Sequence, residues 1–150
     1  MTSLKSVIKC ESVYKIFGAN AKKMLKDANG NVDAQTFQEA GCIVGVNNAS
    51  FDVAKGEMLV VMGLSGSGKS TLLRCISRLT DATAGKIYID GQDLSALKNK
   101  ELIELRRNKM GMVFQSFALL PHKTVLENIA FPLQIKGIKT QDSISKAMEM

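Results

Sequence analysis

The glycine-rich stretch "GLSGSGKS", residues 63–70, constrains the fold of this chain more than any other feature. It follows the apolar run "MLVVM" and opens the amphipathic run "KSTLLRCISRL". Its spacing is G-x-x-x-x-G-K-[ST], in which glycines let several backbone N–H groups converge on a phosphate chain and the following helix adds its positive dipole end. The stretch therefore predicts a phosphate-binding loop between a buried strand and a helix.

Two side chains in this loop have predicted roles. Lys69 reaches the β and γ phosphates, and the Ser70 hydroxyl ligates Mg²⁺. The sequence contains no N-K-x-D guanine-reading motif, which favours ATP with Mg²⁺ as the ligand. The loop residues predicted to bind nucleotide are Gly63, Leu64, Ser65, Gly66, Ser67, Gly68, Lys69, Ser70 and Thr71.

Hydrophobic periodicity predicts an α/β chain. A strand is expected over 6–18, and two more, joined at Gly56, over 42–63; the second of these is apolar on both faces and is expected to be central in a sheet. The helix after the loop is expected to bury Leu72, Leu73, Ile76 and Leu79. The other expected elements are a hairpin over 85–94, a strand over 110–115, and helices over 99–109, 124–135 and 139–150, with Thr124 as a cap and Pro132 as a disturbance.

Residues 19–41 form a polar excursion between the first two strands, with a short helix expected around 33–40. The net charge of +6 suits an anionic ligand, but the basic residues are spread rather than clustered. Three cysteines, an odd number without a C-x-x-C pair, argue against a disulfide framework or a structural zinc site. They favour a reduced, cytosolic setting, and no apolar run approaches the length of a membrane span.

The residues encode phosphate binding but not hydrolysis. Asp90 is the one superficial candidate for a catalytic acid, and the Asp90-Gly91 pair favours a turn instead. The acids after Gln115 do not follow an apolar strand.

The pairing of "GLSGSGKSTLLR" with "MVFQSFALLPHKTVLEN" resembles the ATP-binding subunits of ABC transporters, and most closely the importers of glycine betaine, proline and related quaternary amines. The resemblance implies a P-loop nucleotide-binding domain with an antiparallel β subdomain. It also implies that Phe17 stacks on adenine, with Tyr14 as the competing aromatic. Gln115 would ligate Mg²⁺ together with Ser70 and position the attacking water, so that Lys69 and Gln115 are the implied catalytic residues.

The same resemblance implies partners. Residues 116–128 would lie against the coupling helix of a transmembrane permease subunit, at the cytoplasmic face of the cell membrane, with "ALLPH" as an apolar docking surface. Two copies of the subunit would close on ATP, a solute-binding protein would act indirectly, and no nucleic acid is expected. His122 does not match the family's switch histidine and is interpreted as a loop residue.

The chain departs from the family in lacking an L-S-G-G-Q-type signature, an apolar strand ending in Asp-Glu and the later histidine. We therefore expect residues 1–150 to be the N-terminal part of an ABC-type ATP-binding domain, with an incomplete helical subdomain from about residue 116, and to bind nucleotide with negligible hydrolysis. Two alternatives stay open: a soluble P-loop ATPase or phosphotransferase without a membrane partner, and a nucleic-acid-associated ATPase. Few aromatic residues, 5% of the chain, weigh against the latter.

Overall fold

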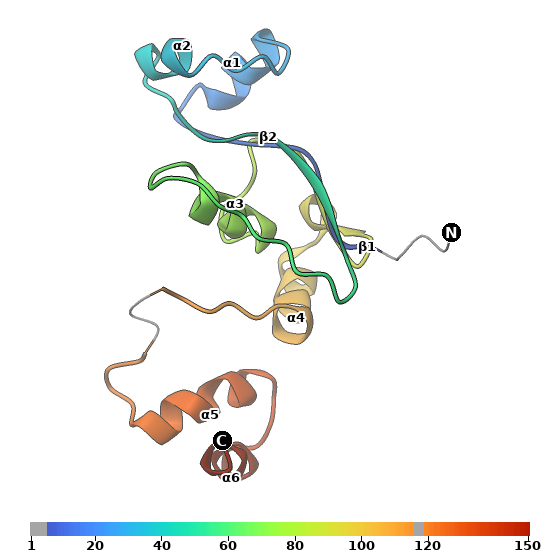
Figure 1. Ribbon diagram of the computed structural model, residues 1–150. Helices are drawn as coiled ribbons and strands as arrows, with labels where there is room; N and C mark the ends of the chain where they lie inside the picture. The colour runs from blue at the N-terminus through green and yellow to red at the C-terminus, as the bar shows by residue number, and fades with distance from the viewer. Residues whose placement is uncertain (1–5, 116–118) are drawn as a thin grey trace. The chain divides into compact units, whose positions relative to one another are not determined.

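The computed structural model describes residues 6–115 and 119–150. The chain forms two compact units, Met1–Leu97 and Lys98–Met150, which are described separately below. Figure 1 shows the first unit in blue to yellow and the second from yellow-brown to red.

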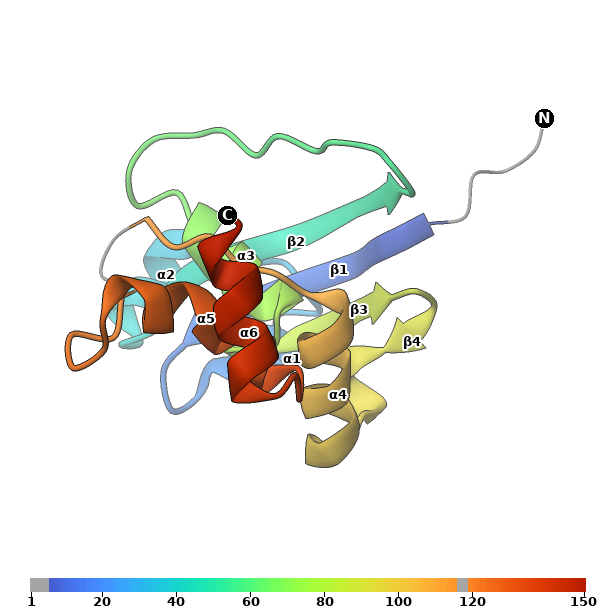
Figure 2. The ribbon, with the colours of Figure 1, turned by 90° about the horizontal axis from the view of Figure 1, so that it is seen from below.

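The first unit is built on an antiparallel sheet. Its strands are β1 (Ser6–Phe17), β2 (Ile43–Ala54), β3 (Ala84–Ile89) and β4 (Gln92–Asp93), in the order β2-β1-β3-β4. Figure 2 shows the long β1 and β2 running side by side, with β3 and β4 beyond β1. The predicted strands over 6–18 and 42–55 are confirmed, as is the predicted hairpin, where Asp90 (φ 49°) and Gly91 (φ 81°) form the turn between β3 and β4. Two positive φ angles are what a type I′ turn requires.

Helix α3 (Lys69–Ile76) packs against β1 and β2. The buried residues of β1 are Cys10, Val13 and Ile16, spaced by three because bulges interrupt the pairing after Cys10 and after Val13. The expected apolar face of the helix is partly wrong. Leu72 and Cys75 are buried, whereas Leu73 and Leu79 are each 54% exposed. The helix ends early, at Ile76, and the left-handed Arg78 (φ 52°) that follows turns Leu79 off the helical face.

The excursion over 19–41 contains two short helices, α1 (Ala21–Asp27) and α2 (Ala34–Glu39). Helix α2 was predicted, and Asp33 caps it by accepting from the Thr36 N–H at 2.8 Å. Helix α1 was not predicted, because it has only seven residues, of which Ala21, Met24 and Leu25 are apolar. A single set of apolar residues at i, i+3 and i+4 in a polar stretch is too short a signal to separate a helix from a loop.

The expected strands over 57–62 and 110–115 are wrong: neither segment forms regular structure. Their apolar side chains are exposed, Met58 by 86% and Val113 by 100%. A strand that is apolar on both faces exists only with hydrogen-bonded neighbours and with layers covering both faces. Among residues 6–115 and 119–150, no strand pairs with either segment.

The second unit is helical. Helix α4 (Asn99–Lys109) and helix α5 (Val125–Ile135) are confirmed, as is α6 (Thr140–Met148). Helices α5 and α6 pack together and bury Ala130 and Ala147. Ser143 is fully buried between them, where its hydroxyl donates to the Thr140 carbonyl at 2.7 Å and accepts from the Gln134 amide at 3.2 Å. Pro132 lies inside α5, which continues to Ile135. Within the described part of the chain, no helix has the length and apolar character that crossing a bilayer requires.

The capping box at the start of α5 yields a first prediction. Glu127 N–H donates to the Thr124 hydroxyl at 3.3 Å, and the Glu127 carboxylate accepts from the Thr124 N–H at 2.8 Å and from its hydroxyl at 2.9 Å. Thr124→Ala is expected to lower the free energy of unfolding of α5 by about 1 kcal/mol at pH 7. Hydrogen exchange of the α5 amides measures this loss, and Ser145→Ala, on the exposed side of α6, is the matched control without a cap.

This capping contribution also depends on pH. The Thr124 N–H and hydroxyl hold the pKa of Glu127 below its usual value. A carboxylate whose pKa is lowered by folding stabilises the folded state above its unfolded pKa, about 4.3, and loses that contribution as the pH falls through the folded value. The difference between wild type and Thr124→Ala should therefore shrink below about pH 4. A difference that stays constant from pH 7 to pH 3 would contradict the role of the carboxylate.

Candidate nucleotide-binding site

The predicted phosphate-binding loop directly precedes α3, as the sequence requires. Gly68 (φ 89°) is the residue before the helix, and its carbonyl accepts the first helical bond, from Leu72 N–H at 2.9 Å. A turn inside the loop is closed by Ser67 N–H donating to the Leu64 carbonyl at 3.2 Å. The free N–H groups at the start of α3 and its dipole therefore face the loop, which makes this end attractive to an anion.

Gly68 is also the point at which the loop approaches the sheet. A Cβ atom at this position would overlap the carbonyl oxygen of Gly45 in β2. Both the positive φ and the absent side chain are therefore required here. The close approach of the two backbones fixes the start of α3 against β2.

Lys69 folds back over the loop. Its Nζ donates to the carbonyls of Gly63 at 2.8 Å and Leu64 at 2.6 Å, and to the Ser67 hydroxyl at 3.3 Å. The ammonium group is thus held inside the curve of the loop, with three donors that can be redirected to phosphate oxygens. Charge-assisted bonds to phosphate are stronger than bonds to neutral carbonyls, so an anion can replace these contacts.

A cavity of about 220 Å³ adjoins the loop. Its lining brings together residues that the sequence predicted, namely Phe17, Gly66, Gly68, Lys69, Ser70 and Thr71. It also includes Ile43, Val44 and Gly45 at the start of β2, which the sequence did not single out. The feature that could have identified these residues is the pairing of β1 with β2, which sets Ile43 opposite Phe17.

The two candidate aromatic residues have different surroundings. Phe17 is 43% exposed and faces the cavity, and Lys15 Nζ lies 4.8 Å from the centroid of its ring. Tyr14 packs instead against the core of the excursion, and its hydroxyl donates to the Gly30 carbonyl at 3.2 Å. Of the two rings, Phe17 is the one beside the phosphate-binding loop.

Gln115 belongs to the second unit, in the exposed segment that follows α4. Its predicted pairing with Ser70 on Mg²⁺ stays a prediction. Residues 116–118 of the predicted docking segment lie outside the described residues, whereas Leu119 is exposed and Leu120 half-buried. His122 lies in the turn before α5, as expected of a loop residue. No carboxylate is among the described residues that line the cavity beside the loop.

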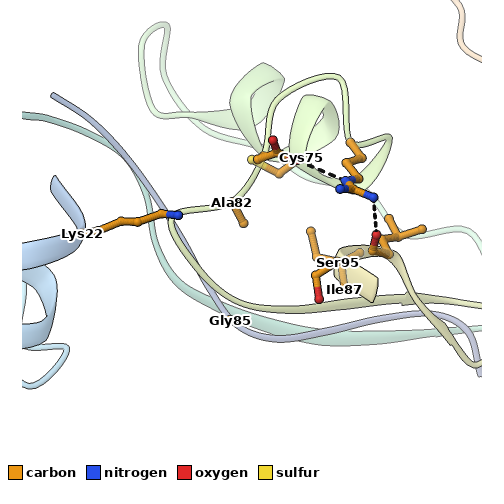
Figure 3. Close-up of a pocket in the computed structure, with 9 residues that line it drawn as sticks. Lys22, Cys75, Ala82, Gly85, Ile87 and Ser95 are labelled. Atoms are coloured by element: carbon orange, nitrogen blue, oxygen red, sulfur yellow. Dashed lines mark hydrogen bonds and ion pairs between the residues drawn. The ribbon is translucent and has the colours of Figure 1, made fainter. Parts of the chain in front are cut away.

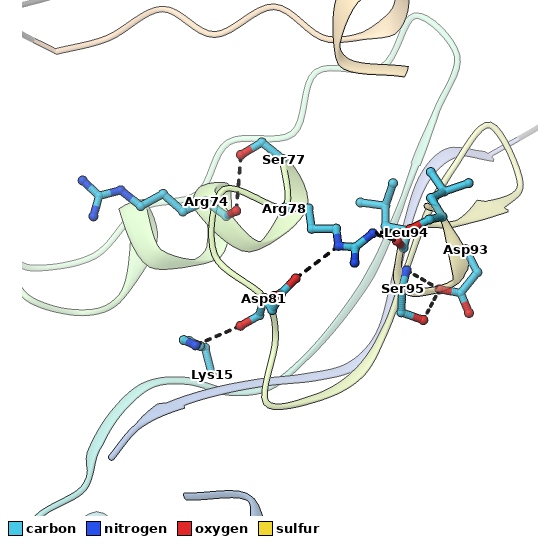
Figure 4. A network of polar contacts seen from close by, with 9 residues as sticks. Lys15, Arg74, Ser77, Arg78, Asp81, Asp93, Leu94 and Ser95 are labelled. Carbon is cyan, nitrogen blue, oxygen red and sulfur yellow. Dashed lines mark hydrogen bonds and ion pairs between the residues drawn. The ribbon is translucent and has the colours of Figure 1, made fainter. Parts of the chain in front are cut away.

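A second cavity, of about 250 Å³, lies at the other end of α3 (Figure 3). The Arg78 guanidinium donates to the carbonyls of Leu94 at 2.6 Å and Leu97 at 2.9 Å, and to the Asp81 carboxylate at 3.1 Å. Figure 4 shows how these bonds connect the end of α3 to the 3₁₀ turn η1 (Leu94–Ala96), while Lys15 Nζ donates to the Asp81 carbonyl at 2.9 Å. The sequence did not predict this network, because its acceptors are mostly backbone carbonyls.

All three cysteines, Cys10, Cys42 and Cys75, are buried free thiols. Burial raises the pKa of Cys10 to about 11 and also raises that of Cys75. These two thiols are therefore protonated at neutral pH and are not nucleophiles. Within residues 6–115 and 119–150, His, Cys, Asp and Glu side chains form no group of three that could hold a metal ion.

The loop, the helix that it opens and the adjoining cavity define a P-loop nucleotide-binding domain. The family model described as ABC transporter matches residues 46–150. The chain belongs to the ABC transporter family, a family of nucleotide-binding proteins.

Several known proteins resemble the chain over nearly all of its length. It is 90% identical to the trimethylamine N-oxide transport system ATP-binding protein TmoW of Pelagibacter ubique, over 96% of this chain and 42% of that protein. It is 49% identical to the glycine betaine transport ATP-binding protein OpuAA of Bacillus subtilis, over 95% of this chain and 34% of that protein. The chain thus spans about two fifths or less of the length of these relatives.

Solved structures confirm the fold class. A dimeric structure of the ATP-binding cassette MJ0796 bound to ADP and Pi superposes with a TM-score of 0.73 at 32% identity. The match covers 95% of this chain and 54% of the MJ0796 chain. The described elements therefore correspond to about half of an ABC cassette.

Proposed function

We propose that this chain is the nucleotide-binding part of an ATP-binding subunit that energises import of a small methylated amine, such as trimethylamine N-oxide or glycine betaine. The observation that carries the proposal is the loop itself, in which the Lys69 ammonium and the start of α3 converge beside the Phe17 cavity. The solute class is supported by the named relatives, of which TmoW is 90% identical. A soluble phosphotransferase remains the alternative.

Each site residue has a proposed role. The Lys69 ammonium and the N–H groups of residues 63–71 bind the triphosphate of ATP, and Ser70 with Gln115 holds Mg²⁺. The Phe17 ring supports the adenine base. Since the cavity lining contains no carboxylate among the described residues, we propose that these 150 residues by themselves bind nucleotide without turning it over.

The proposed partners are a transmembrane permease subunit and a second copy of the ATP-binding subunit, with a solute-binding protein acting through the permease. The proposed site of action is the cytoplasmic face of the cell membrane, and the segment 116–128 is the proposed permease contact, of which the structure describes residues 119–128. Leu119 and Val125 in this segment are exposed apolar side chains. The helical subdomain is proposed to begin near residue 116.

Transport in proteoliposomes tests this function. The full-length ATP-binding protein is reconstituted with the permease and solute-binding protein of a trimethylamine N-oxide transport system, and uptake of labelled solute is measured with and without internal ATP. We expect ATP-dependent uptake of a methylated amine and none of methionine. ATP binding without ATP-dependent uptake of any methylated amine would favour the soluble alternative.

A further inference from the structure

The excursion over 19–41 has no role in the function proposed so far, although it is inserted next to the Phe17 cavity. It leaves the sheet after Phe17, at the end of β1, and returns just before Ile43, at the start of β2. Phe17 and Ile43 are a cross-strand pair, and both line the cavity beside the phosphate-binding loop. The excursion is therefore inserted at the pair of residues next to which the adenine base is predicted to bind.

Neighbouring residues at this end of β1 and β2 alternate between two environments. Ile16 and Cys42 are buried in a core shared with the excursion, whose other fully buried members are Ala21, Leu25 and Phe37. Their immediate neighbours Phe17 and Ile43 are 43% and 69% exposed. Successive side chains of a strand point to opposite faces, so the same backbone presents one face to the excursion core and the other to the cavity.

The neck of the excursion is closely packed. A Cβ atom on Gly18 (φ 141°) would lie 2.5 Å from the Cys42 sulfur and 3.1 Å from the Cys42 Cα atom. The two ends of the excursion therefore touch directly behind the Phe17 and Ile43 pair. Tyr14 links β1 to the excursion by a further hydrogen bond: its hydroxyl donates to the Gly30 carbonyl, in the turn after α1, at 3.2 Å.

On the cavity side, Phe17 is 43% exposed. The Lys15 ammonium lies over its ring, and a Cβ on Gly45 would meet both the ring and the Thr71 methyl group at 3.0 Å. Because the side chain is partly exposed, the position of its ring depends strongly on the backbone that carries it. That backbone is fixed by Ile16, Cys42 and the excursion core on the other face.

We propose that the excursion is a positioning element for the base end of the nucleotide site, acting through the core residue Phe37 and the neck residues Gly18 and Cys42. In this role the excursion acts on the Phe17 and Ile43 pair and sets where the pair presents its apolar surface. This inference rests on the proposed nucleotide binding. It predicts that damage to the excursion core weakens recognition of the base and leaves recognition of the triphosphate intact.

The test compares MgATP with magnesium tripolyphosphate, which lacks the nucleoside and carries one more ionisable oxygen. Dissociation constants of the full-length protein for MgATP and for magnesium tripolyphosphate are measured by calorimetry, together with the melting temperature. Stacking of a base on an aromatic ring is worth at least about fivefold in affinity. Phe37→Ala is therefore expected to raise the MgATP constant at least about fivefold and to change the tripolyphosphate constant by less than about twofold.

Two further variants separate positioning from general destabilisation. Val53→Ala truncates a buried side chain at the far end of β2 and is expected to lower the melting temperature without changing the ratio of the two constants. Phe37→Leu retains more of the core volume than Phe37→Ala and is expected to change the ratio about twofold, between the wild-type value and that of Phe37→Ala. It is the probe that decides if Phe37→Ala does not fold.

The outcomes distinguish this inference from the function on which it rests. An unchanged ratio in folded Phe37→Ala and Phe37→Leu protein would overturn the positioning role, and so would an equal shift with Val53→Ala. Wild-type protein that binds neither ligand would overturn the proposed nucleotide binding instead.

Discussion

Lys69→Ala is expected to weaken MgATP binding by at least about 100-fold, which corresponds to about 2.7 kcal/mol. The Lys69 ammonium reaches three acceptors on the inner side of the loop, Gly63, Leu64 and Ser67. A hydrogen bond between charged groups contributes roughly 1.5–3 kcal/mol, and a triphosphate offers the ammonium more than one oxygen. Calorimetric titration of MgATP into wild type and variant measures the loss.

The matched control for this variant is Lys55→Ala. Lys55 is exposed at the turn after β2 and carries the same charge, so its removal changes the net charge equally. We expect its MgATP affinity to stay within about twofold of wild type, because an exposed charge at a distance is screened by salt. An undiminished affinity in Lys69→Ala would overturn the assignment of the loop as the phosphate site.

Gly68→Ala is expected to have the largest effect on stability. A left-handed φ of 89° is unfavourable for alanine, and the added Cβ would overlap the Gly45 carbonyl. Backbone strain of this kind costs about 1–3 kcal/mol, and overpacking against a backbone atom that cannot rotate away adds a similar amount. We expect a loss of about 2–6 kcal/mol in the free energy of unfolding, measured by urea denaturation, together with loss of MgATP binding.

Gly66→Ala separates the two causes. Gly66 has a similar φ of 82°, but no atom lies within 4 Å of the position of its Cβ. Its loss is expected to be about 1–2 kcal/mol, the conformational cost alone. If the two variants lose the same stability, the close approach of α3 to β2 does not contribute, and the geometric reading of Gly68 is wrong.

The fold could be predicted from sequence wherever the signal was local. The phosphate-binding loop, the Asp90-Gly91 hairpin and the Thr124 cap each depend on a few adjacent residues with particular backbone or side-chain chemistry. The strands that were wrongly predicted over 57–62 and 110–115 would have needed neighbouring strands from other parts of the chain to pair with. Apolar composition alone does not form a strand without neighbours to pair with.

The candidate site shows the same division. Gly68, Lys69 and the helix that they open were identified from spacing alone. Ile43 and Gly45 were not, because their place beside the loop follows from the register of β1 against β2 and from a close backbone approach. The bulges after Cys10 and Val13 break the alternation that would reveal such positions. That Tyr14 packs on the excursion core while Phe17 lines the cavity likewise follows from tertiary packing that the sequence does not show.

The Arg78 network has a mechanical consequence for the first unit. Helix α3 is only eight residues long and is held near both ends. Gly68, just before it, lies close against the Gly45 carbonyl, and Arg78, two residues after it, donates to Leu94, Leu97 and Asp81. A short helix held near both ends is not free to tilt or slide on the sheet that it packs against. We therefore expect a ligand that displaces the loop to move α3 and the sheet together.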